Sequence, residues 1–120
     1  GADSLSLVNT LLGLAIDVRT RRPILGNITG GFAGPAIKPV ALRMVWQVAK
    51  AVNIPVSGLG GIMTGIDAIE FMMAGADTVQ IGTANIIDPN AMERIADEMD
   101  EWCDKNGVKD IQEIVGTLKA

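Results

Sequence analysis

The sequence predicts an α/β fold in which parallel strands alternate with helices, and three observations support this. Short apolar runs bounded by glycine and proline, such as "IPVSGLGGI", are typical of buried parallel strands. Stretches with helical spacing of apolar residues separate these runs. The motif "GAD" stands at a strand entry at Gly75 and again at Gly1, 74 residues earlier. That interval equals two βα units of about 35 residues, so we expect a segment of a longer (β/α)8 barrel.

The expected elements follow one another along the chain. A strand is expected at about Leu5–Asn9, and "LAIDV" and "RPILG" around the tip "RTRR" predict a short β-hairpin. "GNITGGFAGPAIKP" predicts a glycine-rich loop without periodicity. Further strands are expected in "IPVSGLGGI" and "DTVQIGT", and "ANIID" predicts one helical turn. Helices are expected over 39–52, 64–75, 88–105 and 109–119.

Apolar spacing and capping residues define the helices. Pro39 suits a first helical turn, and Gly75 is typical of a helix end. Asp88 is the expected N-cap of the third helix, with Pro89 at its first position and Asn106-Gly107 ending it. Apolar stripes that we expect to pack in the core are Val40, Met44, Val45, Val48 and Val52, and then Ile66, Ile69, Met72 and Met73.

Composition excludes several classes of protein. The chain has no histidine, so it contains neither a histidine zinc site nor a Ser-His-Asp triad, and we predict no metal site. Apolar runs stay below the ~18 residues of a membrane span, so we expect no membrane association. The single cysteine, Cys103, favours a reducing compartment and hence the cytoplasm, and we expect it to be a buried structural thiol. Sparse basic residues and 3% aromatic residues argue against nucleic-acid binding.

Small residues follow two neighbouring predicted strands, at the edge where barrel active sites lie. Gly60 and Gly61 follow one strand, and Gly82 and Thr83 end the next. Exposed backbone N–H groups at such strand ends form a cradle for a phosphate group, and a side chain added at Gly61 or Gly82 is expected to enter it. The alternative is that these glycines only make tight turns.

Asn9 and Thr10 follow the first predicted strand and differ in chemistry from the glycines. An amide and a hydroxyl offer donors and acceptors to a planar polar ligand without a change of charge. The alternative is a local turn bond from the Asn9 side chain. Lys38 opens a helix, either as a loop cation or as a solvated lysine.

These motifs together resemble a known family. "VNTLLGLAID", "GNITGGFAGPAIKPVALRMV", "IPVSGLGGI" and "QIGTAN" are similar to the C-terminal part of class 1 dihydroorotate dehydrogenase, and "NTLLGLAID" resembles its 1B subtype. "GGFAGPAIKP" is specific, whereas "GGI" and "IGTA" occur in many phosphate-binding barrels. The resemblance implies that residues 1–120 form the C-terminal half-barrel segment of an FMN-binding (β/α)8 TIM barrel. About three parallel strands with helices, plus a β-hairpin insertion, are then expected.

The resemblance also implies an activity, the FMN-dependent oxidation of dihydroorotate to orotate in pyrimidine biosynthesis. Asn9 and Thr10 would bind the substrate, and Val8 and Gly34 would line the flavin. The FMN phosphate would be held by Gly60, Gly61, Gly82 and Thr83. The family's catalytic cysteine lies upstream of this region, so we expect no catalytic residue in this chain and no activity from it alone. Implied partners are the N-terminal part of the barrel, a subunit that passes electrons to NAD, and further copies in a homo-oligomer.

Two alternatives stay open. One is another FMN- or phosphate-binding barrel, such as a dihydrouridine synthase or a dihydropyrimidine dehydrogenase domain. The other is a non-catalytic half-barrel that self-associates. Strand alternation leads us to expect an apolar open sheet face, and with it dimerisation or aggregation of the isolated chain. The residues concerned are Leu5, Leu7, Val56, Val79 and Ile81.

Overall fold

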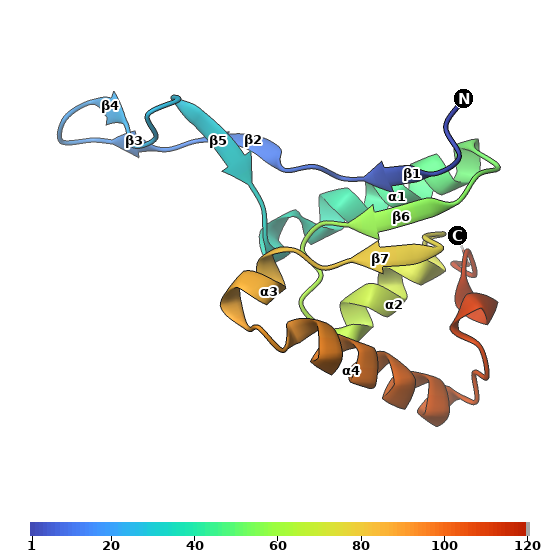
Figure 1. Cartoon of the computed structure of the whole chain (residues 1–120). Helices are drawn as coiled ribbons and strands as arrows, with labels where there is room; N and C mark the ends of the chain where they lie inside the picture. Colours follow the sequence, from blue (N-terminus) through green and yellow to red (C-terminus); the bar gives the residue numbers. More distant parts are fainter. Residues whose placement is uncertain (120) are drawn as a thin grey trace.

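The computed structural model describes residues 1–119, which form a parallel sheet covered by helices and a protruding β-arm (Figure 1). The sheet contains β1 (Leu5–Leu7), β6 (Val56–Leu59) and β7 (Thr78–Gln80), in the order β1-β6-β7. Both neighbouring pairs are parallel. The predicted α/β class with three parallel strands is therefore confirmed. Ala120, the last residue of the predicted segment, lies outside the described residues.

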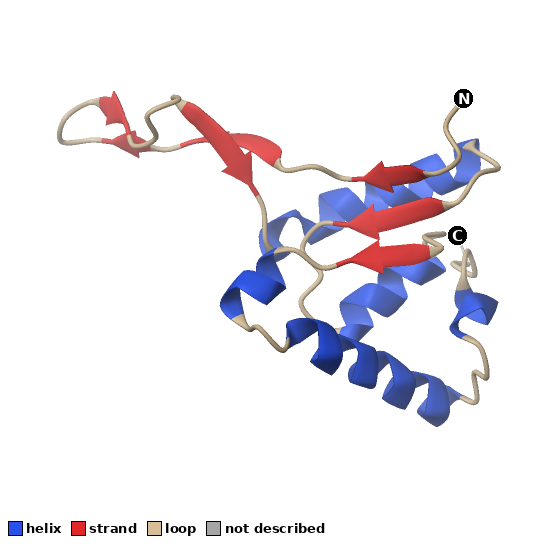
Figure 2. Ribbon diagram, in the orientation of Figure 1, coloured by secondary structure: helices blue, strands red, loops and turns tan. Residues whose placement is uncertain are grey.

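Within residues 1–119, two helices connect the parallel strands, and two more follow the last strand. The bounds are α1 (Lys38–Ala51), α2 (Gly65–Met73), α3 (Thr83–Ile87) and α4 (Ala91–Asn106), with short 3-10 segments η1 (Pro35–Ile37) and η2 (Ile111–Ile114). In Figure 2, α1 and α2 lie on one side of the sheet, and α4 runs alongside α2. The main core lies between strands and helices and includes Ala41, Val45, Val56, Ala68 and Phe71. Among the described residues, no helix combines the length and the apolar character that crossing a membrane requires.

Helix ends follow the predicted signals, with two corrections. Of the helix predicted over 109–119, the structure forms only the 3-10 segment η2. Gly75 has a φ of +114° just after α2, and Gly107 caps α4 in the left-handed conformation with a φ of +68°. However, α4 begins at Ala91 with Asn90 as its N-cap residue, so the predicted N-cap at Asp88 is wrong. Asp88 Oδ1 instead accepts a hydrogen bond from Asn90 N at 3.0 Å and closes the turn before the helix.

The apolar stripe of each of the first two helices is narrower than expected. Val40 and Ile66 are exposed, although both belong to the predicted stripes. The buried side of α2 includes Ala68, Phe71 and Met72, and Ile66 lies beyond its edge. The reason is that a helix on a barrel sheet buries one stripe and leaves its flanks to solvent or to neighbouring elements.

The arm contains two antiparallel strand pairs and extends away from the sheet (Figure 1). β2 (Leu11–Leu14) pairs with β5 (Thr29–Phe32), and β3 (Ile16–Asp17) pairs with β4 (Arg22–Pro23). The predicted hairpin is therefore confirmed near its basic tip. The loop predicted over 26–39 is wrong in part, because it contains β5 and η1. The sequence pattern did not predict β5, because the two glycines in "TGGF" are typical of a loop.

The sheet face opposite the helices is mainly polar. Ser6, Ser57 and Gln80 lie on it, and Gln80 Nε2 donates hydrogen bonds to the two serine hydroxyls at 3.0 and 2.9 Å. The predicted apolar open face is therefore wrong. The strands are only three or four residues long, and their apolar residues other than Leu59 occupy the row that faces the helices. Val56 is buried, Leu5 is half-buried, and the others pack against the main core, namely Leu7, Val79 and Ile81.

Candidate functional site

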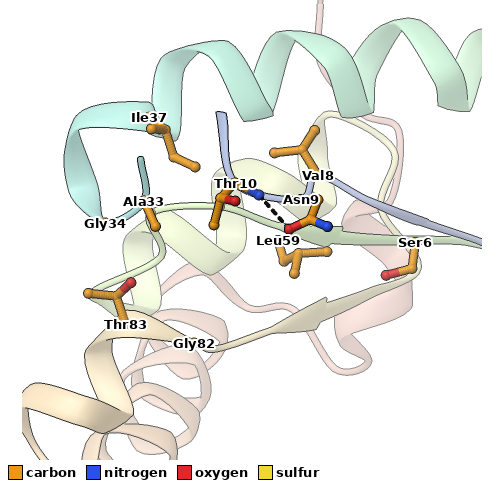
Figure 3. Close-up of a pocket in the computed structure, with 12 residues that line it drawn as sticks. Ser6, Val8, Asn9, Thr10, Ala33, Gly34, Ile37, Leu59, Gly82 and Thr83 are labelled. Carbon is orange, nitrogen blue, oxygen red and sulfur yellow. Dashed lines mark hydrogen bonds between the residues drawn. The ribbon is translucent and has the colours of Figure 1, made fainter. Parts of the chain in front are cut away.

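A pocket of about 390 Å³ lies where the carboxyl ends of β1, β6 and β7 meet η1 and the start of α3 (Figure 3). It brings together all eight site residues predicted from the sequence, because the carboxyl ends of parallel strands share one edge of a sheet. Their individual roles stay predictions. The lining residues are Ser6, Val8, Asn9, Thr10, Ala33, Gly34, Ile37, Leu59, Gly60, Gly61, Gly82 and Thr83.

Glycine is required at the turn that follows β6. Gly60 and Gly61 have φ values of +130° and +80°, which side chains rarely adopt. A Cβ atom at Gly60 would lie 2.6 Å from the Ala41 Cβ atom, and one at Gly61 would lie 2.7 Å from the Gly34 carbonyl oxygen. A valine at Gly61 would thus strain the backbone, so the expectation that it simply enters the phosphate position is wrong.

Gly82 lies under different constraints at the end of β7. Its φ is −110°, and a Cβ atom there would meet no other atom within 4 Å. Gly82 is the residue just before α3, and Thr83 begins that helix. A side chain added at Gly82 would therefore occupy open space at the pocket wall rather than clash with the fold.

Asn9 makes the local turn bond that the sequence left as an alternative. Its Oδ1 atom accepts a hydrogen bond from Thr10 N at 2.7 Å, shown dashed in Figure 3. Both residues are exposed at the pocket, and the Asn9 amide still offers its NH₂ group as a donor. The Thr10 side chain lies against Gly31 of β5, where a Cβ atom would be 2.5 Å from Thr10 Oγ1. The arm thus positions one wall of the pocket.

Lys38 is neither a loop cation nor a solvated lysine, so both predicted interpretations are wrong. Its Nζ atom lies 2.5 Å from Asp67 Oδ1 and 2.7 Å from Glu70 Oε2. Burial acts to lower the pKa of Lys38, but its hydrogen bonds to the two carboxylates outweigh burial and raise that pKa. Burial likewise acts to raise the pKa of Asp67, and hydrogen bonds from Lys38 and Met63 N reverse this and lower it.

Four residues of the pocket were not found by sequence reasoning, namely Ser6, Ala33, Ile37 and Leu59. The alternation of side chains along β1 could have identified Ser6, because it places Ser6 on the open sheet face, where the pocket lies. Ala33 and Ile37 gave no such signal, since they lie in a stretch whose glycines and prolines hide its regular structure.

Two candidate reactive groups lie outside the pocket. Cys103 is half-buried in α4, and burial, followed by the nearby carboxylates of Asp100, Asp104 and Glu113, raises the pKa of its thiol. Asp17 lies in the arm, where hydrogen bonds from Thr20 and from Arg19 N lower its pKa. A cysteine with a raised pKa and a carboxylate held ionised in a turn are poorly suited to abstract a proton at the pocket. Residues 1–119 contain no group of three or more metal-ligating side chains placed to hold an ion.

Comparison with known proteins points to one family. A family model described as dihydroorotate dehydrogenase matches residues 1–102. The "Dihydroorotate dehydrogenase B (NAD(+)), catalytic subunit" of Geobacter metallireducens is 65% identical over 118 residues, and that of Bacteroides fragilis is 60% identical over 119. The match covers 98% of this chain in the first case and 99% in the second, and the chain spans 39% of the length of each relative.

A solved structure supports the same assignment. The crystal structure of DHODH from Eimeria tenella in complex with ferulenol superposes with a TM-score of 0.79 at 28% sequence identity. The match covers 96% of this chain and 31% of that chain. The sheet, its helices and the site edge described above therefore have a counterpart of known structure.

Proposed function

The chain belongs to the dihydroorotate dehydrogenase family and folds as part of that family's barrel, and from this premise we propose that it serves in the oxidation of dihydroorotate to orotate. This reaction belongs to pyrimidine biosynthesis. We propose that the 120 residues form the C-terminal part of a longer barrel, called the complete protein below. The catalytic base is then a residue of the complete protein outside this segment.

The observation that carries the proposal is the convergence of eight predicted residues on one pocket at the carboxyl ends of three strands. Gly34, Gly60 and Gly61 bring backbone close to the pocket, and Gly82 leaves its wall open. Such a surface suits a phosphate group bound through N–H groups, so the residues fit FMN. When bound, FMN would accept the hydride that leaves dihydroorotate.

The residues of this chain bind and orient rather than move protons. Gly60, Gly61, Gly82 and Thr83 would hold the phosphate through backbone groups and one hydroxyl. Val8, which is buried, and Gly34 would border the flavin. Asn9 and Thr10 would offer their amide and hydroxyl groups to the substrate at the opposite side of the pocket. Residues that orient FMN and the substrate relative to each other lower the entropic cost of the reaction.

The names of the relatives support partners for the complete protein. Those relatives are catalytic subunits of an enzyme that uses NAD, which supports a second subunit that passes electrons from flavin to NAD. The exposed apolar side chains of the arm support association with further protein surface, and we propose a homo-oligomer. The family match favours this function over the other flavin barrels and over a non-catalytic half-barrel.

The test compares the complete protein with the isolated chain. Purified complete protein should release FMN on denaturation, identified by mass spectrometry, and should form orotate from dihydroorotate when the second subunit and NAD are supplied. Isolated residues 1–120 with added FMN should form none. Complete protein without flavin, or orotate formation by the isolated chain, contradicts the proposal.

A further inference from the structure

Lys38 connects the first residue of α1 to the loop that follows β6. Its Nζ atom donates to Asp67 Oδ1 and to Glu70 Oε2, which are 29 and 32 residues further along the chain. The Lys38 side chain is 24% exposed and that of Asp67 is 15% exposed, so the pair is largely shielded from water. A partly buried ion pair of this kind is screened less by water and salt than one on an open surface, so its geometry is better fixed.

Asp67 also binds the end of the loop that follows β6. Its Oδ2 atom accepts hydrogen bonds from Met63 N at 2.9 Å and from Thr64 N at 3.0 Å. These are the residues that follow Gly60, Gly61 and Ile62. One carboxylate thus holds the end of the loop with one oxygen and Lys38 with the other.

The stem of Lys38 borders the start of the same loop. A Cβ atom at Gly61 would lie 3.0 Å from both the Cβ atom and the backbone N of Lys38. Lys38 therefore packs against Gly61 directly and is tied to Met63 and Thr64 through Asp67. On the other side, Glu98 Oε2 accepts from Gly65 N at 2.5 Å, and Arg94 Nη1 donates to the Met63 carbonyl at 3.3 Å.

We propose that Lys38 is a positioning residue for the phosphate cradle, which holds the Gly60–Gly61 turn in its binding conformation through Asp67. This inference rests on the proposed function of that turn. Lys38 does not act as the cation of the phosphate, because its ammonium group faces two carboxylates. The cradle is then shaped by an ion pair that never touches the ligand.

The experiment titrates the apo form of the complete protein with FMN and with riboflavin, which lacks the phosphate. Lys38→Met keeps the stem against Gly61 and removes the charge, and it should weaken FMN binding about tenfold or more while leaving riboflavin binding unchanged. Lys38→Arg, which keeps a cation for the carboxylates, should restore most of the FMN affinity. A general loss of stability would instead weaken both ligands.

Asp67→Asn separates positioning from direct contact. If Lys38 acts through Asp67, this variant weakens FMN binding as Lys38→Met does, and the double variant is no weaker than either single one. If Lys38 bound the phosphate directly, the two substitutions would act independently, the double variant would bind FMN more weakly than either single one, and the inference would be overturned. Glu70→Gln is the matched control and should change FMN affinity little, because Glu70 contacts Lys38 but has no hydrogen bond to residues 60–65.

The outcomes also separate this inference from the proposed function. If wild-type complete protein binds no FMN, the proposed function itself fails. If it binds FMN and Lys38→Met binds it equally well, the cradle stands and the role of Lys38 is wrong. Should Lys38→Met not fold, Lys38→Gln takes its place in the same FMN and riboflavin titrations.

Discussion

Gly82 is the pocket glycine at which a side chain tests the cradle without straining the fold. Its Cβ position is free of other atoms within 4 Å, whereas Gly60 and Gly61 sit against neighbouring residues. We expect Gly82→Val in the complete protein to lower FMN affinity at least about tenfold, because the added methyl groups take up space at the pocket wall. Flavin titration and circular dichroism of the apo protein measure affinity and fold separately.

Gly26→Val is the matched control for this substitution. Gly26 lies in the arm, and its Cβ position also has no atom within 4 Å. It should bind FMN like the wild type. Wild-type affinity in Gly82→Val would remove Gly82 from the phosphate site.

Asn9 combines a local bond with a predicted role in substrate binding. Loss of a hydrogen-bonding partner leaves polar groups of the site unpaired and costs about 1–3 kcal/mol. Asn9→Ala should therefore raise KM for dihydroorotate or reduce kcat about tenfold, with flavin still bound. Steady-state kinetics with flavin absorbance recorded on the same sample measure both.

Asn9→Asp distinguishes the two roles of this side chain. It keeps an oxygen to accept from Thr10 N, as Oδ1 does at 2.7 Å, but removes the NH₂ donor. We expect it to be impaired like Asn9→Ala. Normal turnover in Asn9→Asp together with impaired turnover in Asn9→Ala would show that Asn9 acts only through its turn.

At the scale of elements, the carboxylates of Asp67 and Glu98 accept hydrogen bonds from the segment that joins β6 to α2, and protonation in acid would weaken both. The pKa of Asp67 is lowered from 3.8, and that of Glu98 is lowered from 4.5, first by the hydrogen bond from Gly65 N and then by Arg94. A group whose pKa is lower in the folded state than in the unfolded state stabilises the fold at pH values above its unfolded-state pKa. This contribution is lost as pH falls through the folded value.

We therefore expect the free energy of unfolding of the complete protein to decrease as pH falls below about 4.5, with part of the slope due to these groups. Urea denaturation at a series of pH values measures it. Asp67→Asn should be less stable at neutral pH and should show a shallower decrease in acid. An unchanged slope in Asp67→Asn would mean that this carboxylate does not contribute to the pH dependence.

At the scale of the whole molecule, the arm makes the chain extended. The radius of gyration is 16.6 Å, whereas a compact domain of this length has about 14 Å. Leu12 on β2 is 83% exposed and Val18 near the arm tip is 87% exposed, although both are large apolar residues. The open sheet face, by contrast, carries Ser6, Ser57 and Gln80 in one hydrogen-bonded group.

We predict that the isolated chain self-associates, and that it does so through the arm rather than the sheet face. Leu12→Glu should shift sedimentation toward the monomer over a concentration series, because it places a charge within the apolar surface. Thr78→Glu, on the open sheet face, is the control and should leave association unchanged. If only Thr78→Glu disperses the chain, the sheet face is the association surface after all. A wild-type chain that stays monomeric at every concentration would contradict the prediction altogether.

The sequence by itself determined the order of the three parallel strands and the helices between them, and the residues at the strand ends. Periodicity and capping residues are local signals, and parallel strands bring their carboxyl ends to one edge wherever they pair. That is why Asn9, Gly60 and Gly82, far apart in the chain, were predicted to share a pocket in which the structure places them.

Only the tertiary structure decided the pairing of the arm strands, the polar character of the open sheet face and the partners of Lys38. β5 is stabilised by its pairing with β2 despite its glycines, which no local pattern reveals. The Lys38–Asp67 pair joins residues 29 positions apart, and its existence depends on how α1 and α2 pack on the sheet. Contacts between distant residues follow from packing, whereas the sequence pattern reports what neighbours along the chain prefer.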